Sequence, residues 1–210
     1  GMQRELTTRS SRLHVPQLDR NGRIVVSARA LRSFGFGLNS VALGLYLAAL
    51  QLPAETIGLI LAAALAGTLA LTAVIGVWGD RIGRRRILVI GSALMLLSAV
   101  IPLVGANPVL LALIGLSGMV AVTSSESTGL QSVDQAALPQ TVSPQQRTHA
   151  FALYNLVAAA ASALGALSVG PMVSLGHALG LEGASAYAPA FLAYALAGLV
   201  STILTLGLDA

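Results

Sequence analysis

Five charged residues within seven positions, between two long apolar runs, constrain the fold more than any other feature of the sequence. The stretch from Gly76 to Arg86 reads GVWGDRIGRRR and contains Asp80 and four arginines. The apolar runs on both sides have about the length that a helix needs to cross a hydrocarbon core of about 30 Å. Because charged groups are costly within a membrane, we expect the cluster to form a short turn at the boundary with water.

The composition agrees with a membrane protein. Of 210 residues, 55% are hydrophobic and only 10% are charged, whereas soluble domains carry about 25% charged residues. The basic residues are twelve arginines and no lysine, seven of them within the first 32 positions and four in the cluster. A nucleic-acid partner would require basic residues spread with aromatics over a polar surface, so none is expected. The chain has no cysteine, which excludes disulfides and thiolate metal sites.

Hydropathy divides the chain into two parts. We predict that residues 1–27 are a disordered cytoplasmic N-terminal tail and that residues 28–208 form an all-α integral membrane bundle of six transmembrane helices. The fourth apolar stretch is only 16 residues long, so its helix must continue through polar residues toward Ala137. The expected spans are about 28–50, 56–78, 87–104, 108–137, 151–175 and 187–208.

The arginines predict the orientation of these spans. With six spans, every arginine falls on one side of the membrane or at the adjoining end of the first span. The positive-inside rule makes this side cytoplasmic and places both termini there. We therefore expect a multi-pass protein of the cell (plasma or inner) membrane.

The charged cluster resembles a known family signature. The pattern G-x-x-x-D-R-x-G-R-R resembles the loop 2–3 motif of the major facilitator superfamily, with matches at Gly76, Asp80, Arg81, Gly83, Arg84 and Arg85. The resemblance implies the N-terminal six-helix half of such a transporter, built from two inverted three-helix repeats. It also implies that the loop is a conformational latch and that Asp80 engages the opposite half. We expect the glycines to let two helices and a tight turn approach closely. The alternative is that the arginines only fix topology.

The function implied is secondary active transport of a small solute, of the permease or efflux type, by alternating access. The sequence has no phosphate-binding loop, so we expect energy from an ion or solute gradient. The resemblance to a transporter family also implies no cofactor and no enzymatic activity. The expected partners are a small-molecule substrate, a coupling ion and the lipid bilayer. The other half of the transporter would be either a C-terminal half in the same native chain or a second copy, which would make a homodimer.

Polar residues within the spans are the candidates for substrate or proton binding. Glu126 is the strongest: it could carry a proton or a cation in a cavity, or it could pair with arginines of the cluster. Gln131 would line the same polar region. Arg32 could bind substrate, although snorkelling to the cytoplasmic surface is the favoured interpretation. Asn39 and Tyr46 share one helix face and could line a cavity or form hydrogen bonds between helices.

Two further patterns complete the candidates. Gly170-Pro171 predicts a helix kink and resembles in part the glycine–proline element of drug–proton antiporters, which favours efflux. Ser117 in G-L-S-G, followed by His177, resembles the Ser–His dyad of rhomboid proteases, an intramembrane serine protease alternative. No spacing of His, Asp and Glu indicates a metal site.

Overall fold

The computed structural model describes residues 20–117 and 147–207 of the chain, and throughout these residues it contains helices and no strand. The predicted all-α class is therefore confirmed for the described part. The elements are α1 (Arg20–Ala49), α2 (Ala54–Ile82), α3 (Arg84–Leu94), the 3₁₀ helix η1 (Met95–Val100), α4 (Ile101–Val104), α5 (Pro108–Gly115), α7 (Arg147–Leu167), α8 (Val169–Ala178), the 3₁₀ helix η4 (Gly183–Tyr187) and α9 (Ala188–Leu206).

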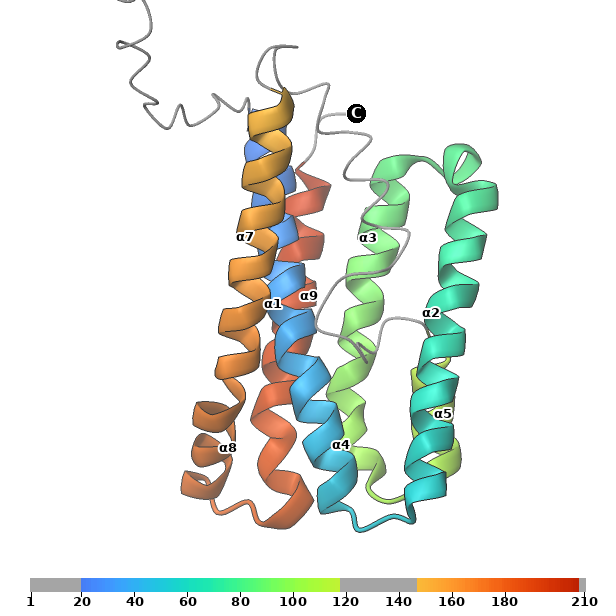
Figure 1. Cartoon of the computed structure of the whole chain (residues 1–210), viewed down its shortest axis with the longest axis vertical. Coiled ribbons are helices and arrows are strands. Elements are labelled where there is room, and N and C mark those ends of the chain that lie inside the picture. The colour runs from blue at the N-terminus through green and yellow to red at the C-terminus, as the bar shows by residue number, and fades with distance from the viewer. Residues whose placement is uncertain (1–19, 118–146, 208–210) are drawn as a thin grey trace, which may run out of the picture.

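The long helices run side by side along the longest axis of the molecule (Figure 1). Helix α1 packs most extensively against α7 and α9, α9 also contacts α3 and η1, and α2 packs against α5. Buried apolar side chains concentrate around α1 and α9, where Leu38, Met95 and Tyr194 belong to one cluster. Many large apolar side chains of α2, α5 and α7 instead point outward, among them Leu69 and Leu167, which are more than 70% exposed. Such an outer surface suits a lipid environment.

Two glycines bring α1 and α7 into backbone contact. A Cβ atom on Gly37 would lie 2.0 Å from the carbonyl oxygen of Ser162, and one on Gly165 would lie 2.0 Å from the carbonyl oxygen of Phe34. Neither position has room for any side chain. Small residues allow this close approach, which is common between helices in membranes.

Helix α1 begins at Arg20, eight residues earlier than predicted. Residues 20–27, which the sequence had assigned to the N-terminal tail, are helical. Val25 is buried and forms a small cluster with Ala150 and Tyr154 of α7. Packing against α7 therefore extends α1 through a stretch whose arginines had indicated a solvated tail.

The predicted third and fifth spans are each interrupted. Residues 95–100 of the third form a 3₁₀ helix, and the segment ends in α4, where Pro102 lacks a backbone N–H. The fifth is divided at Ser168 into α7 and α8. In a continuous helix, the ring of a proline would clash with the carbonyl group four residues earlier. For Pro171 that residue is Leu167, the last residue of α7, so the helix ends where the clash would arise.

Three helical stretches among the described residues have the length and composition to cross a membrane: Ala54–Trp78, Arg147–Ala178 and Gly183–Leu206. Helix α1 has 30 residues but carries four arginines. The third predicted span is divided among three elements, and most of the fourth lies outside the described residues. The count of six spans thus stays a prediction.

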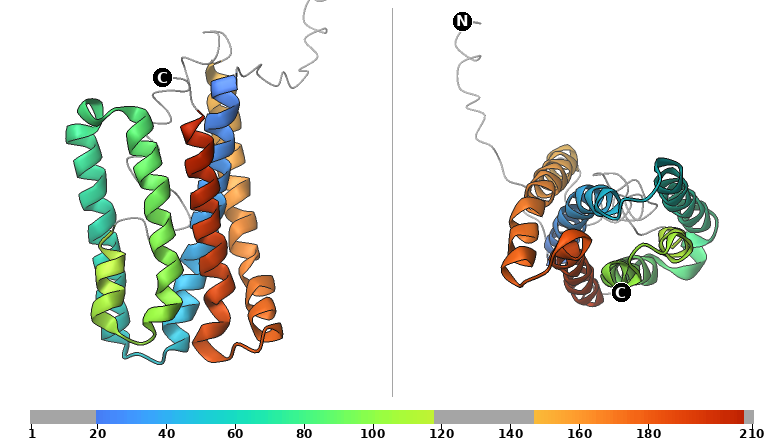
Figure 2. Two further views of the ribbon diagram at one scale, coloured as in Figure 1. Left: turned by 180° about the vertical axis from the view of Figure 1, so that it is seen from behind. Right: turned by 90° about the horizontal axis from the view of Figure 1, so that it is seen from below.

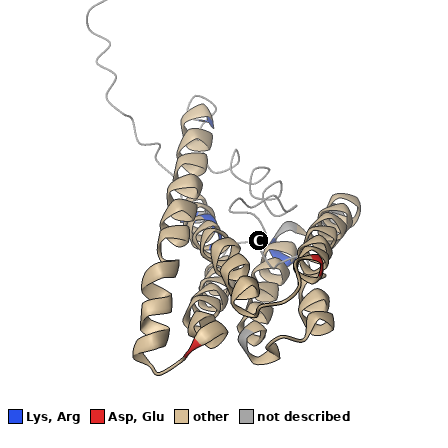
Figure 3. Ribbon diagram, turned by 60° about the horizontal axis from the view of Figure 1, so that its bottom comes forward, with Lys and Arg blue, Asp and Glu red and all other residues tan. Residues whose placement is uncertain are grey.

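The described charged residues are separated along the bundle. The start of α1, the turn between α2 and α3, the start of α7 and the end of α9 lie together at one end, as Figures 1 and 2 show. We call this the arginine end, because Arg20, Arg81 and Arg147 lie in those segments. The turns that join α1 to α2, α4 to α5 and α8 to η4 lie at the other end. The acidic residues there are Glu55 in the first turn of α2 and Glu182 just before η4 (Figure 3).

Candidate functional site

The motif residues form a tight turn at the arginine end. Helix α2 continues through Asp80 and Arg81 to Ile82, and α3 begins at Arg84, so Gly83 is the only non-helical residue between them. Gly83 has φ 90° and ψ 137°, a conformation close to a region open essentially to glycine alone. The predicted loop is thus shorter than the sequence indicated. Glycine at this position is required by backbone conformation.

The two motif glycines do not bring elements of the described chain into close contact. A Cβ atom added to Gly76 or to Gly83 would meet nothing within 4 Å. The expectation of close approach at these glycines is therefore not met within the described residues. Gly76 lies on an exposed face of α2 together with Val77 and Trp78, which are 69% and 48% exposed. Any close approach there would have to come from a segment beyond the described residues.

Arg85 connects the turn to the last helix. Its Nη2 donates a hydrogen bond to the carbonyl oxygen of Leu206, the final residue of α9. Carbonyl groups at the end of a helix lack partners within the helix, and a cation there also interacts favourably with the helix dipole. The motif arginine therefore holds α3 and α9 together at the arginine end. The alternative that Glu126 pairs with these arginines is not tested, because Glu126 lies outside the described residues.

Arg32 lies in the interior of the bundle. Its side chain is fully buried, and Nη1 donates to Ser201 Oγ of α9 at 3.4 Å. Ser201 Oγ in turn lies 3.1 Å from Ser92 Oγ of α3. The favoured expectation that Arg32 snorkels to the surface is wrong, because α3 and α9 cover this face of α1 and supply hydroxyl groups there. Arg32 therefore links α1 to α9 directly and to α3 through Ser201.

A second buried arginine, which the sequence analysis did not single out, lies one turn away. Arg29 is 5% exposed, and its guanidinium carbon lies 5.1 Å from the ring centre of Tyr154 on α7. A cation over an aromatic face at this distance is attracted by the ring quadrupole. Arg29 and Arg32 are three residues apart, so they share one side of α1 and join it to α7 and α9 respectively. The three-residue spacing could have indicated from the sequence that Arg29 and Arg32 lie on one side of the helix. Their partners on α7 and α9 could not be predicted.

The two polar candidates in the second half of α1, Asn39 and Tyr46, are both buried. Tyr46 is 1% exposed, and its hydroxyl donates to the carbonyl of Ile101 at 3.1 Å and lies 3.4 Å from that of Gly105. Its ring also packs edge-on against Phe191, with centres 5.3 Å apart. Of the two predicted roles, Tyr46 therefore has the interhelix hydrogen bond. Asn39 is fully buried on the same face and also faces the interior.

The structure also bears on the remaining candidates. Glu126 and Gln131 lie outside the described residues. Ser117 follows α5, while His177 is in α8, and both views place these helices on opposite sides of the bundle (Figures 1 and 2). The structure thus does not bring the proposed protease dyad together. The described residues contain no group of three His, Asp or Glu side chains that could hold a metal ion.

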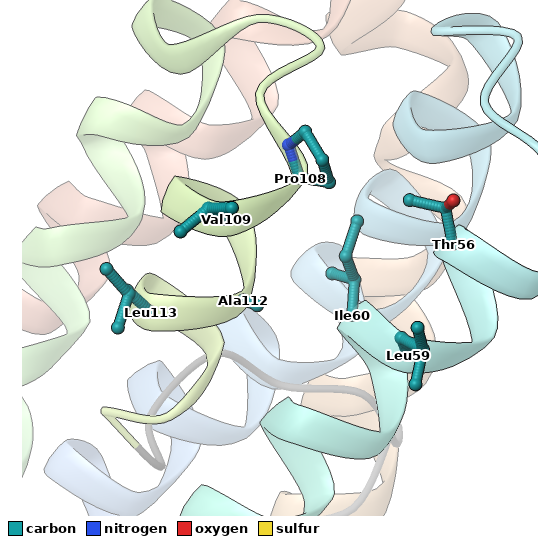
Figure 4. A pocket seen from close by; sticks show the side chains of 7 residues that line it. All are labelled: Thr56, Leu59, Ile60, Pro108, Val109, Ala112 and Leu113. Carbon is teal, nitrogen blue, oxygen red and sulfur yellow. The ribbon is translucent and has the colours of Figure 1, made fainter.

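An apolar groove lies between α2 and α5. Figure 4 shows the side chains around it: Thr56, Leu59, Ile60, Pro108, Val109, Ala112 and Leu113. Its volume is about 430 Å³, and Thr56 supplies the one polar side chain among these residues. The groove therefore lacks the converging polar groups that fix the orientation of a polar solute.

The fold and the arginine turn define an all-helical membrane protein with apolar outer faces. The family model of the Major Facilitator Superfamily matches residues 25–209. The chain therefore belongs to the major facilitator superfamily. It is also 32% identical over 167 residues to the uncharacterized membrane protein YJR124C of Saccharomyces cerevisiae, a match that covers 79% of this chain and 37% of the yeast protein. The chain thus corresponds to well under half of this relative's length. No solved structure matches the chain.

Proposed function

We propose that this chain forms one half of a secondary transporter that moves a small solute across the membrane by alternating access. The observation that carries the proposal is the motif turn at Gly83, together with the hydrogen bond from Arg85 to the end of α9. Alternating access by rocking requires each half to move as a rigid body. A turn that joins α2, α3 and α9 at one end would supply such rigidity.

The second half of the transporter would contact the exposed end of α2. Gly76 has open space around its Cα, and the neighbouring Val77 and Trp78 are exposed. The family resemblance assigns Asp80, on the next turn of the same helix, to contact with the opposite half. Since the chain corresponds to 37% of its yeast relative, further helices of the native chain could complete the transporter. A second copy of this chain is the alternative.

Cysteine cross-linking separates these alternatives, because these 210 residues contain no cysteine and any cysteine elsewhere in the native protein can first be replaced by serine. We expect Val77→Cys in the native full-length protein to remain monomeric after oxidation if the second half belongs to the same chain. A covalent dimer that forms with Val77→Cys and not with Leu164→Cys, which is exposed on α7, would support the homodimer.

Transport itself is tested on the motif residues. We expect Gly83→Val and Asp80→Glu to reduce solute uptake or dye efflux strongly in cells that express the full-length protein, while the amount in the membrane stays normal. Wild-type transport in both variants would contradict the latch. For the proposed proton or cation role of Glu126, the measurement is the pH dependence of transport in Glu126→Gln, and an unchanged profile would remove Glu126 from the coupling mechanism.

We further propose that the arginine end faces the cytoplasm of a cell whose plasma or inner membrane contains the protein. Thr148 is exposed at the arginine end, and Gln51 is exposed in the turn at the other end. Single cysteines at these positions should react with a membrane-impermeant maleimide from opposite sides, Gln51→Cys in intact cells and Thr148→Cys only after the membrane is opened. Labelling of Thr148→Cys in intact cells would reverse the orientation.

The direction of transport that we propose is efflux. The support is the sequence Gly170-Pro171 in α8, directly after the break at Ser168, and its partial resemblance to the glycine–proline element of drug–proton antiporters. Cells that express the protein should then accumulate less of a fluorescent cationic dye than cells that express Asp80→Glu. Equal accumulation, together with protein-dependent uptake of labelled solutes, would favour import.

A further inference from the structure

A second cavity, at the arginine end, combines positive charge with apolar walls. It has a volume of about 540 Å³ and is lined by Ile82 of α2, Leu206 of α9 and five residues between Gly83 and Ile90 at the start of α3. Three helices therefore contribute to it, and a hydrogen bond from Arg85 to the carbonyl of Leu206 joins two of its lining residues. Its volume falls within the range of about 300–1,000 Å³ that is usual for small-molecule sites.

The polar groups of this cavity suit an anion. Arg85 and Arg86 both line it, and both are exposed to the surroundings. A guanidinium carries five N–H donors in a planar fork that matches the oxygens of a phosphate group. The bond to Leu206 leaves further donors of Arg85 for a ligand. Inorganic phosphate would need only these donors and would gain nothing from apolar walls.

The apolar walls continue along the bundle away from the arginines. Ile90 and Leu206, which line the cavity, are 52% and 50% exposed. Leu97 lies seven residues after Ile90 and Ile203 lies one turn before Leu206, and both are exposed as well. Leu97 belongs to η1, and both α3 and η1 pack against α9, so these side chains form an apolar track that begins at the cavity. An amphiphile with a phosphate head and hydrocarbon tails would fit both the arginine-lined cavity and the apolar track.

We propose that this cavity binds the headgroup of an anionic phospholipid. Arg86, with support from Arg85, would contact the phosphate, and an acyl chain would lie along α3 and α9. Basic pockets at the surface of membrane helices recognise lipid headgroups in this way. Lipid binding at this cavity requires that the protein lie in a membrane, as its family does, but it does not require the proposed transport function.

Trp78 provides a built-in reporter for this binding. It is the one tryptophan of the chain, it is 48% exposed, and it lies four residues before Ile82 on the same face of α2. The chain would be reconstituted in phosphatidylcholine vesicles, and a rising fraction of lipid would be replaced by dibrominated phosphatidylglycerol, whose bromines quench tryptophan. A parallel series would use dibrominated phosphatidylcholine. We expect stronger quenching by phosphatidylglycerol at equal mole fraction.

Matched variants assign the preference to the cavity. Arg86→Gln should lower the preference for phosphatidylglycerol about fivefold, the effect expected for one basic residue at a membrane surface. Arg86→Lys, which keeps the charge, should retain most of it. The control is Arg147→Gln, because Arg147 is exposed at the same end of the bundle but outside the cavity, and it should lower the preference clearly less than Arg86→Gln does. Circular dichroism of each variant would verify that the helices are intact.

Three results would overturn the proposal. Equal quenching by the two lipids would mean that no anionic lipid is selected. An equal loss in Arg86→Gln and Arg147→Gln would assign the preference to general surface charge. Loss of the preference in the presence of excess inorganic phosphate would assign the cavity to a free anion.

Discussion

Alanine in place of Gly37 would put one methyl group against the backbone of α7. The added Cβ would lie 2.0 Å from the carbonyl oxygen of Ser162, whereas real Cβ atoms essentially never approach another atom within 3.0 Å. The two helices must therefore separate by at least about 1 Å at this point, because a helical carbonyl cannot rotate away as a flexible side chain can. The reciprocal contact of Gly165 with Phe34 lies at the same crossing and would be lost together with it.

The expected cost follows from two opposing terms. Overpacking of a well-packed interface costs about 1–3 kcal/mol, and replacing glycine by alanine within a helix returns about 0.5–1 kcal/mol. Because the contact is with backbone, the overpacking cost should lie in the upper half of its range, and Gly37→Ala should lower the free energy of unfolding by roughly 1–2 kcal/mol. For a chain of this size that corresponds to a decrease of about 2–8 °C in the melting temperature.

Gly44 is the matched control, since it lies on the same helix and a Cβ there would meet nothing within 4 Å. Gly44→Ala should gain the higher helix propensity of alanine without any clash, and should raise the melting temperature by up to about 4 °C. Both variants would be melted in detergent at one heating rate, with helical circular dichroism as the readout. Removal of the Ser162 side chain in Ser162→Gly should not rescue Gly37→Ala, because the clash is with the carbonyl. Equal shifts for Gly37→Ala and Gly44→Ala would refute the close crossing of α1 and α7.

Three further substitutions test other parts of the structure in the same melting assay. Gly83→Ala should lower the free energy of unfolding by about 1–3 kcal/mol, because Gly83 has a positive φ. The control Gly76→Ala, at an open helical position, should leave stability unchanged or raise it. Equal shifts in melting temperature for the two variants would contradict the strained turn. Tyr46→Phe removes the hydroxyl that is hydrogen-bonded to a buried carbonyl and should lower the free energy of unfolding by about 1–2 kcal/mol. The control Tyr187→Phe should change stability little. An unchanged melting temperature in Tyr46→Phe would show that this hydrogen bond does not contribute to stability. Asn107 caps α5 through its side-chain oxygen, so Asn107→Ala should cost about 1 kcal/mol, and an unchanged melting temperature would show that this cap does not contribute to stability.

Several features of the fold could be predicted from local sequence because their causes are local. The apolar runs between charged segments predicted the helices. Pro171 predicted an interruption in the fifth apolar run, and the observed break at Ser168 precedes that proline by three residues. The motif from Gly76 to Arg85 predicted a tight turn and the family, and the family was confirmed by the match over residues 25–209.

The roles of the polar residues could not be predicted, because they depend on which helices meet. Arg32 appeared from its position near a helix end to be a snorkelling residue, yet α3 and α9 enclose it with Ser92 and Ser201. Tyr46 could have lined a cavity and instead donates a hydrogen bond to the carbonyl of Ile101, the first residue of α4. No local pattern distinguishes a serine that meets an arginine from one that faces lipid, since the distinction arises from the rotation of each helix about its axis.

The sequence by itself determined that this chain is a helical membrane protein of one family, because hydrophobic length and charge placement set what can cross a bilayer. Tertiary structure alone decided how closely the helices pack and what each buried polar group contacts. Gly37 shows the difference: glycine is compatible with many positions in a membrane helix, and only the carbonyl of Ser162 on α7, 125 residues away in the chain, makes it necessary there. Contacts between residues distant in the sequence depend on the path of the whole chain.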